Sequence, residues 1–75
     1  MDKYVLLNAL KEMRNKAEEM YDKISKEDDR LQAKRENATS KSTKDAILIQ
    51  QEIWYELQNM LWDIVIFVEE RIIGE

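Results

Sequence analysis

The sequence predicts an all-α protein, an antiparallel two-helix hairpin over about residues 3–36 and 43–73 that dimerises into a four-helix bundle. Three observations support this prediction. The chain contains no Pro and a single Gly, so it lacks the residues that usually interrupt helices. Apolar residues recur at helical spacing in the first half of the chain. In the second half they cover a wider arc of the helix than contact with one neighbouring helix requires.

The composition describes one small domain without covalent cross-links. A chain of 75 residues buries a small fraction of its surface and is marginally stable alone. It has no Cys, which excludes disulfides, and no His, the commonest metal ligand and general base. Its hydrophobic content of 44% favours folded helices over disorder. We therefore expect oligomerisation or a bound partner to supply the missing stability.

The first predicted helix has one apolar face. Asp2 can cap its start. Six apolar residues then alternate in spacing between four and three, which is typical of the contact line of an antiparallel coiled coil, and Leu7 and Tyr21 widen their stripe. The six are Leu6, Leu10, Met13, Ala17, Met20 and Ile24. Beyond them the same positions are mostly polar, so we expect residues 25–36 to extend the helix as a largely solvated arm; the alternative is that this stretch is disordered.

The only plausible break in the chain is the polar segment 37–43. It is rich in Asn, Ser and Thr, which compete with the backbone for hydrogen bonds and favour caps and turns. Ser42 or Thr43 can cap the second helix, with Asp45 in its first turn. Gly74 is expected to end that helix.

The second helix carries more apolar surface than the first can cover. Its large apolar residues fill an arc of roughly 160°. When the chain folds about a turn near residue 40, Leu61, Ile64 and Phe67 come opposite the apolar face of the first helix. Four others come opposite Leu31, Glu27 and their polar neighbours instead: Ile47, Leu48, Ile49 and Ile53. Leaving such side chains in water costs about 1.5–3 kcal/mol each.

This imbalance predicts self-association. Two hairpins that pair as a four-helix bundle would bury the excess apolar surface, and so would one hairpin bound to another protein. The residues we expect in the self-association surface are Ile47, Ile49, Ile53, Trp54, Leu57, Leu61, Val65 and Val68.

A line of acidic residues without Lys or Arg runs along the second helix. One interpretation is a solvated face, and the other is a contact surface for basic residues of a partner. Trp62 and Tyr55 lie at the edge of the apolar arc, where aromatic side chains can anchor an interface. The residues we expect to bind a partner protein are Trp62, Tyr55, Glu52, Glu56 and Asp63.

The sequence carries no convincing catalytic set. Nucleophilic catalysis lacks both Cys and a His base, and there is no Gly-rich phosphate loop. The segment 56–63 is similar to an acidic motif of all-helical nucleotide pyrophosphatases, but Asn59 stands where that motif has a carboxylate. Magnesium-dependent chemistry needs several converging carboxylates. We therefore predict no enzyme activity, no cofactor and no metal site.

These observations favour a small non-enzymatic protein–protein interaction module, such as a regulator or inhibitor of a low-GC bacterium or phage that docks on a larger protein. The alternatives are a purely structural self-assembling bundle and a hairpin that binds nucleic acid through basic residues near the turn. The net charge of −4 disfavours nucleic acid and anionic membranes. No signal peptide or membrane span is recognisable, so we expect a cytoplasmic protein. The basic residues near the turn are Lys23, Lys26, Arg30, Lys34, Arg35, Lys41 and Lys44.

Overall fold

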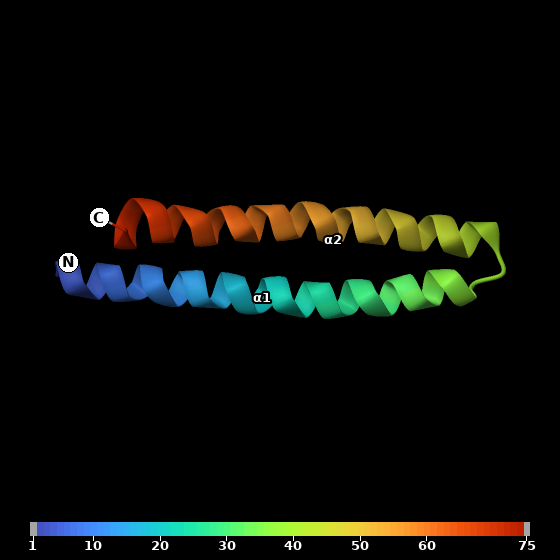
Figure 1. Ribbon diagram of the computed structural model, residues 1–75, viewed down its shortest axis with the longest axis horizontal. Helices are drawn as coiled ribbons and strands as arrows, with labels where there is room; N and C mark the ends of the chain where they lie inside the picture. The colour runs from blue at the N-terminus through green and yellow to red at the C-terminus, as the bar shows by residue number, and fades with distance from the viewer. Residues whose placement is uncertain (1, 75) are drawn as a thin grey trace.

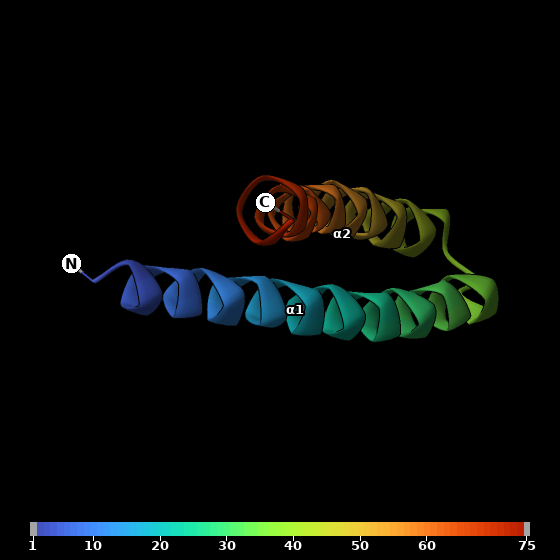
Figure 2. The same cartoon turned by 60° about the vertical axis from the view of Figure 1, so that its left-hand side comes forward.

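The computed structural model describes residues 2–74 and shows two long antiparallel helices side by side (Figure 1). Helix α1 spans Lys3–Asn37 and helix α2 spans Lys41–Phe67. A π-helical segment, η1, continues α2 over Val68–Ile73. The predicted helical hairpin is therefore confirmed. Residues 2–74 form no third layer, so both faces of the helix pair are open, as two views show (Figures 1 and 2).

Helix α1 begins where its sequence provides a cap. The side chain of Asp2 accepts a hydrogen bond of 3.1 Å from the backbone N–H of Tyr4, as predicted. At the other end, the N–H of Ala38 donates to the carbonyl of Arg35. The helix includes residues 25–36, most of which are exposed as predicted and none of which is buried. Leu31 and Gln32 are half-buried there.

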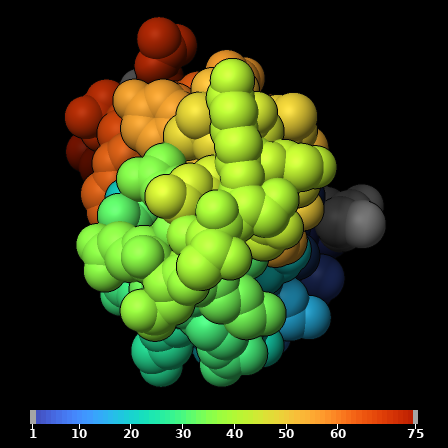
Figure 3. All heavy atoms as spheres, turned by 90° about the vertical axis from the view of Figure 1, so that its right-hand side faces the viewer, coloured from blue at the N-terminus to red at the C-terminus, as the bar shows by residue number. Residues whose placement is uncertain are grey.

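The turn is shorter than the sequence suggested, because it contains only residues 38–40. Ser40 has extended backbone angles, and its hydroxyl accepts a hydrogen bond of 3.5 Å from the N–H of Thr43. The predicted cap at Ser42 or Thr43 is therefore wrong. The N–H of Thr43 has no partner within the helix, and Ser40 is three residues before it, at the spacing of a helix cap. The residues after Ser40 therefore form the first turn of α2. The side chains of the turn cover the end of the helix pair (Figure 3).

The last turn ends at Gly74 because a side chain would not fit there. Its N–H donates to the carbonyl of Glu69 at 2.7 Å, the hydrogen bond that closes η1. A Cβ added at Gly74 would lie 2.8 Å from the same carbonyl oxygen. The glycine has φ −69°, so the close approach explains it rather than a left-handed backbone. The predicted end of the second helix is confirmed.

The buried core of the hairpin is small. Ala17 and Ile24 of α1 pack with Leu61 and Val65 of α2, and Trp54 and Leu57 lie partly buried against them. Val68, in η1, has no exposed surface.

Only half of the predicted contact line of α1 faces α2. Ala17 and Ile24 are buried, whereas Leu6, Met13 and Met20 remain 50%, 45% and 49% exposed. The residues that follow these three in the sequence are half-buried instead. Because Ala17 and Ile24 stay in the contact and only the other half of the line shifts by one residue, the contact line turns by about 50° around the helix. The exposed residues thus lie beside the helix contact and not within it.

Candidate interaction surface

Polar side chains join the two helices along one edge and fix their relative height. Gln58 donates hydrogen bonds to the Ser25 hydroxyl at 2.7 Å and to the Tyr21 carbonyl at 3.2 Å. Nearer the turn, Gln51 donates to the Gln32 side chain at 3.0 Å. Residues 21–25 of α1 are therefore level with Gln58.

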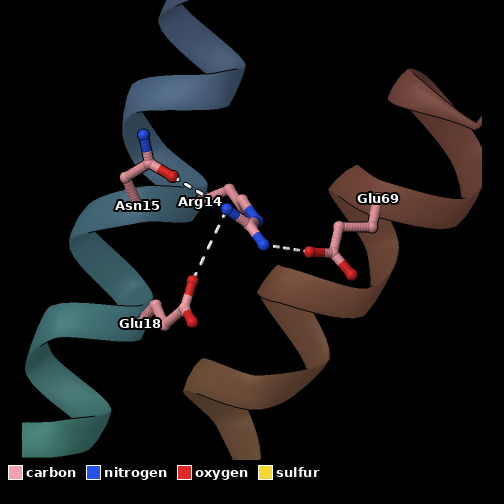
Figure 4. A network of polar contacts seen from close by, with 4 residues as sticks. All are labelled: Arg14, Asn15, Glu18 and Glu69. Carbon is pink, nitrogen blue, oxygen red and sulfur yellow. Dashed lines mark hydrogen bonds and ion pairs between the residues drawn. The ribbon is translucent and has the colours of Figure 1, made fainter.

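The same edge carries an arginine network near the open end of the hairpin (Figure 4). The guanidinium of Arg14 donates to the side chain of Asn15 at 2.9 Å and lies 3.5 Å from a carboxylate oxygen of Glu18. It also forms an ion pair with Glu69, which links α1 to η1. Because these groups are partly exposed, the network contributes at most about 1 kcal/mol per pair and mainly fixes geometry.

An aromatic pair completes this edge, which we name the polar edge. The ring centroids of Tyr21 and Trp62 are 5.3 Å apart, and the planes are inclined by 50°. The described residues that make contacts between helices along the polar edge are Arg14, Tyr21, Ser25, Gln32, Gln51, Gln58, Trp62 and Glu69.

The side of the helix pair opposite the polar edge carries exposed apolar residues. Leu6, Met13 and Met20 each precede a residue that turns toward α2 or the polar edge, so they point to the other side of α1. On α2, Ile64 precedes the buried Val65 in the same way. Two antiparallel helices are related by an approximate twofold axis that is perpendicular to the plane containing both helix axes. A rotation about this axis exchanges the helices but leaves the same broad side of the pair facing the viewer. These residues therefore share one face.

Helix α2 adds a second row of apolar residues to this face. Ile53 and Met60 stand four residues before Leu57 and Ile64, which makes them neighbours on the helix surface. Ile49 and Phe67 extend the row in both directions. We name the resulting surface the apolar face. It consists of Leu6, Met13, Met20, Ile49, Ile53, Met60, Ile64 and Phe67, whose exposed fractions range from 36% to 63%.

A shallow groove of about 450 Å³ lies in the α2 part of the apolar face. It is bounded by aliphatic side chains and by two glutamates at its rim. The lining residues are Ile49, Glu52, Ile53, Glu56, Leu57 and Met60.

Charges of opposite sign border the apolar face along its two long sides. Along α1 the basic border consists of Lys16, Lys23 and Arg30, and all three are exposed. Each follows the line of Met13 and Met20 at helical spacing. Arg30 lies 3.2 Å from a carboxylate oxygen of Glu27.

Along α2 and η1 the border is acidic. It consists of Glu56, Asp63 and Glu70, which are exposed and, like the basic residues, spaced seven apart. Glu56 stands three residues after Ile53, and Asp63 stands three residues after Met60, so both adjoin the apolar face. The apolar face is thus enclosed between a row of cations and a row of anions.

The five predicted partner-binding residues are all exposed and lie within an arc of roughly 120° around α2, from the polar edge to the rim of the groove. Trp62 lies on the polar edge against Tyr21, and Tyr55, which is 65% exposed, stands seven residues before it on the same line. The acidic residues are exposed on the side of α2 away from α1, and Glu52 and Glu56 border the groove. The centre of the groove and Tyr55 are separated by roughly 130° around α2.

The predicted self-association residues fall into two groups. Leu61, Val65 and Val68 are 8%, 1% and 0% exposed, because they pack within the single hairpin. Ile47, Trp54 and Leu57 are half-buried. Ile49 and Ile53 remain 59% and 54% exposed, so of the predicted set these two are the most open to a second molecule.

Sequence reasoning missed the α1 half of the apolar face. Leu6, Met13 and Met20 were expected inside the hairpin. The row of residues immediately after them, such as Leu7 and Tyr21, is half-buried. These residues show that α2 contacts the line of α1 that begins one residue later than predicted. That row was visible in the sequence as a second line of seven-residue spacing.

Within residues 2–74, no group of three or more acidic side chains is placed to hold a metal ion. No helix in this part of the chain has the length and apolar content needed to cross a membrane. No protein-family model, curated protein or solved structure matches the chain.

Proposed function

We propose that this protein is a non-enzymatic protein–protein association module that binds a helical protein surface against its apolar face. The observation that supports the proposal is the row of eight large apolar side chains on one side of a two-helix hairpin. Contiguous exposed apolar surface of this kind marks interaction sites in soluble proteins.

The energetics favour a binding surface over a tolerated exposed face. Full burial of one such side chain contributes about 1.5–3 kcal/mol, so burying the half-exposed residues of the face contributes on the order of 1 kcal/mol each. A domain of this size is stable by only about 4–11 kcal/mol. Covering the apolar face would therefore change the free energy by an amount comparable with the stability of the whole hairpin.

Docking on a larger protein through Trp62, Tyr55 and the acidic side chains remains a second candidate. The exposure of Tyr55 supports it. Binding of nucleic acid has less support, because the net charge of the chain is −4 and Arg30, one of the basic residues near the turn, lies beside Glu27. The two surfaces share the acidic side of α2, so Tyr55 on one and the groove residues Ile53 and Met60 on the other are the positions that test them separately.

The proposal predicts that Ile53→Lys combined with Met60→Lys abolishes association, because both lysines enter the groove. Tyr55→Lys is the matched control, since Tyr55 is equally exposed but lies outside the face. Association is measured by sedimentation velocity and by comparing the proteins that each variant captures from its source cells. Circular dichroism verifies that both variants stay helical.

Two results would contradict the proposal. One is loss of binding in the Tyr55→Lys control while the double variant binds normally, which would favour docking through the polar edge. The other is a wild-type chain that stays monomeric between about 1 and 100 µM and captures the same proteins as the double variant.

A further inference from the structure

We propose that the occupant of the apolar face is a second copy of this chain, packed so that both turns lie at the same end of a four-helix bundle. This inference rests on the proposed function and adds the identity and orientation of the partner. It is carried by the charged borders of the face.

The two borders make the apolar face self-complementary. If a second hairpin is rotated by 180° about the long axis and laid on the face, its α1 covers α2 of the first copy. Its basic border then follows the acidic border of the first copy, and the same contact repeats on the other side. A different protein would need to supply the same two rows of opposite charge to match this surface.

The relative height of the helices brings the charges into register. Gln58 is level with residues 21–25, so Lys23 of one copy falls between Glu56 and Asp63 of the other. By the same offset, Lys16 falls between Asp63 and Glu70. Each of these cations thus meets two carboxylates.

The apolar residues match in the same arrangement. Met20 of one copy comes level with Met60 and Ile64 of the other, and Met13 comes level with Phe67. Near the turn, the aliphatic stems of Arg30 and Lys34 lie over the groove, where long charged side chains can cover apolar surface.

The opposite orientation is disfavoured by charge. A rotation about an axis across the helices would place the turns at opposite ends and lay α1 on α1 and α2 on α2. Each border would then run beside an identical one. Like charges on facing helices destabilise an interface and so disfavour that orientation.

The area of the face suits a stable dimer. The hairpin measures 56 × 19 × 15 Å, so one broad side offers on the order of 1000 Å². Specific complexes bury about 800 Å² per partner. A pair of hairpins packed on this side therefore reaches the size of a specific interface.

A charge-exchange experiment tests the partner. Variant one carries Lys16→Glu and Lys23→Glu, and variant two carries Glu56→Lys and Asp63→Lys. Each alone places like charges beside each other at both borders, so its dimer should dissociate about 10- to 100-fold more readily than wild type. An equimolar mixture should form a heterodimer of near wild-type affinity. Unchanged self-association of either variant, or a mixture that does not associate, overturns the inference.

A distance measurement tests the orientation. The chain has no Cys, so Thr39→Cys in the turn gives a single site for a nitroxide label. Turns at the same end should place the labels within about 25 Å, since packed helices lie 8–10 Å apart. A distance near the 56 Å length of the hairpin overturns the proposed orientation.

The outcomes separate this inference from the proposed function. If the wild-type chain stays monomeric but captures another protein that the Ile53→Lys/Met60→Lys variant does not capture, the inference fails and the association function stands. If neither self-association nor capture depends on the apolar face, both fail.

Discussion

At the scale of single residues, a few side chains hold the hairpin together. Val65 is 1% exposed and belongs to the cluster of Ala17, Ile24 and Leu61 at the centre of the helix contact. So small a core leaves few neighbouring side chains that can adjust to a lost methyl group. The stability of the hairpin is therefore sensitive to truncation here.

We predict that Val65→Ala lowers the free energy of unfolding by about 1.5–3 kcal/mol, through lost burial and a residual cavity. The control is Ile66→Ala at the adjacent position, where the side chain is 37% exposed and the expected loss is about 1 kcal/mol or less. Urea denaturation followed by circular dichroism measures both. Equal losses in the two variants would show that Val65 does not lie in the core.

Arg14 shows how one residue departs from the apolar pattern. It is half-buried on the line that α1 presents to α2, where a coiled coil usually has an apolar residue. Its charge is compensated by Glu18 and Glu69, which come from the two sides of the contact. An arginine at this place therefore favours one alignment of η1 against α1.

At the scale of elements, the helices begin and end where local chemistry dictates. Asp2 and Ser40 accept hydrogen bonds from N–H groups that a helix leaves free, and Gly74 closes the last turn. Four serine or threonine residues stand in or near the turn: Thr39, Ser40, Ser42 and Thr43. The one used is Ser40, because its hydroxyl accepts from the N–H of Thr43.

We predict that Ser40→Ala destabilises the hairpin by about 1 kcal/mol, because the N–H of Thr43 loses its acceptor. Ser42→Ala is the control, and its effect should stay within about 0.5 kcal/mol because exposed positions tolerate such changes. Thermal denaturation of the two variants gives the comparison. A larger effect at Ser42 would restore the cap that the sequence alone suggested.

The sequence was sufficient to predict both helices, their antiparallel arrangement and the approximate turn. It was not sufficient to choose which line of α1 faces α2. Met13 and Met20 are more apolar than Arg14 and Tyr21, so a pattern of hydrophobicity selects the wrong line. The line that is used depends on contacts between distant residues, such as Tyr21 with Trp62 and Arg14 with Glu69.

The same limit applied to the interaction surface. The excess of apolar residues on α2 predicted that something must cover it, and the exposure of Ile49 and Ile53 agrees with that reasoning. The α1 half of the face could not be predicted, because it depends on which line of residues of α1 contacts α2. The two charged borders can likewise be recognised only when it is known which residues of the two helices lie on the same side of the pair.

At the scale of the whole molecule, folding and association are expected to be coupled. A partner that binds the folded chain stabilises it by mass action, so the stability of a dimeric hairpin depends on protein concentration. We predict that the melting temperature of the wild-type chain rises by about 3–6 °C for each tenfold increase in concentration. The Ile53→Lys/Met60→Lys variant should melt at a lower temperature that does not vary with concentration. Calorimetry over a hundredfold range distinguishes the cases, and a wild-type melting temperature that stays constant would mean that one hairpin folds without covering its apolar face.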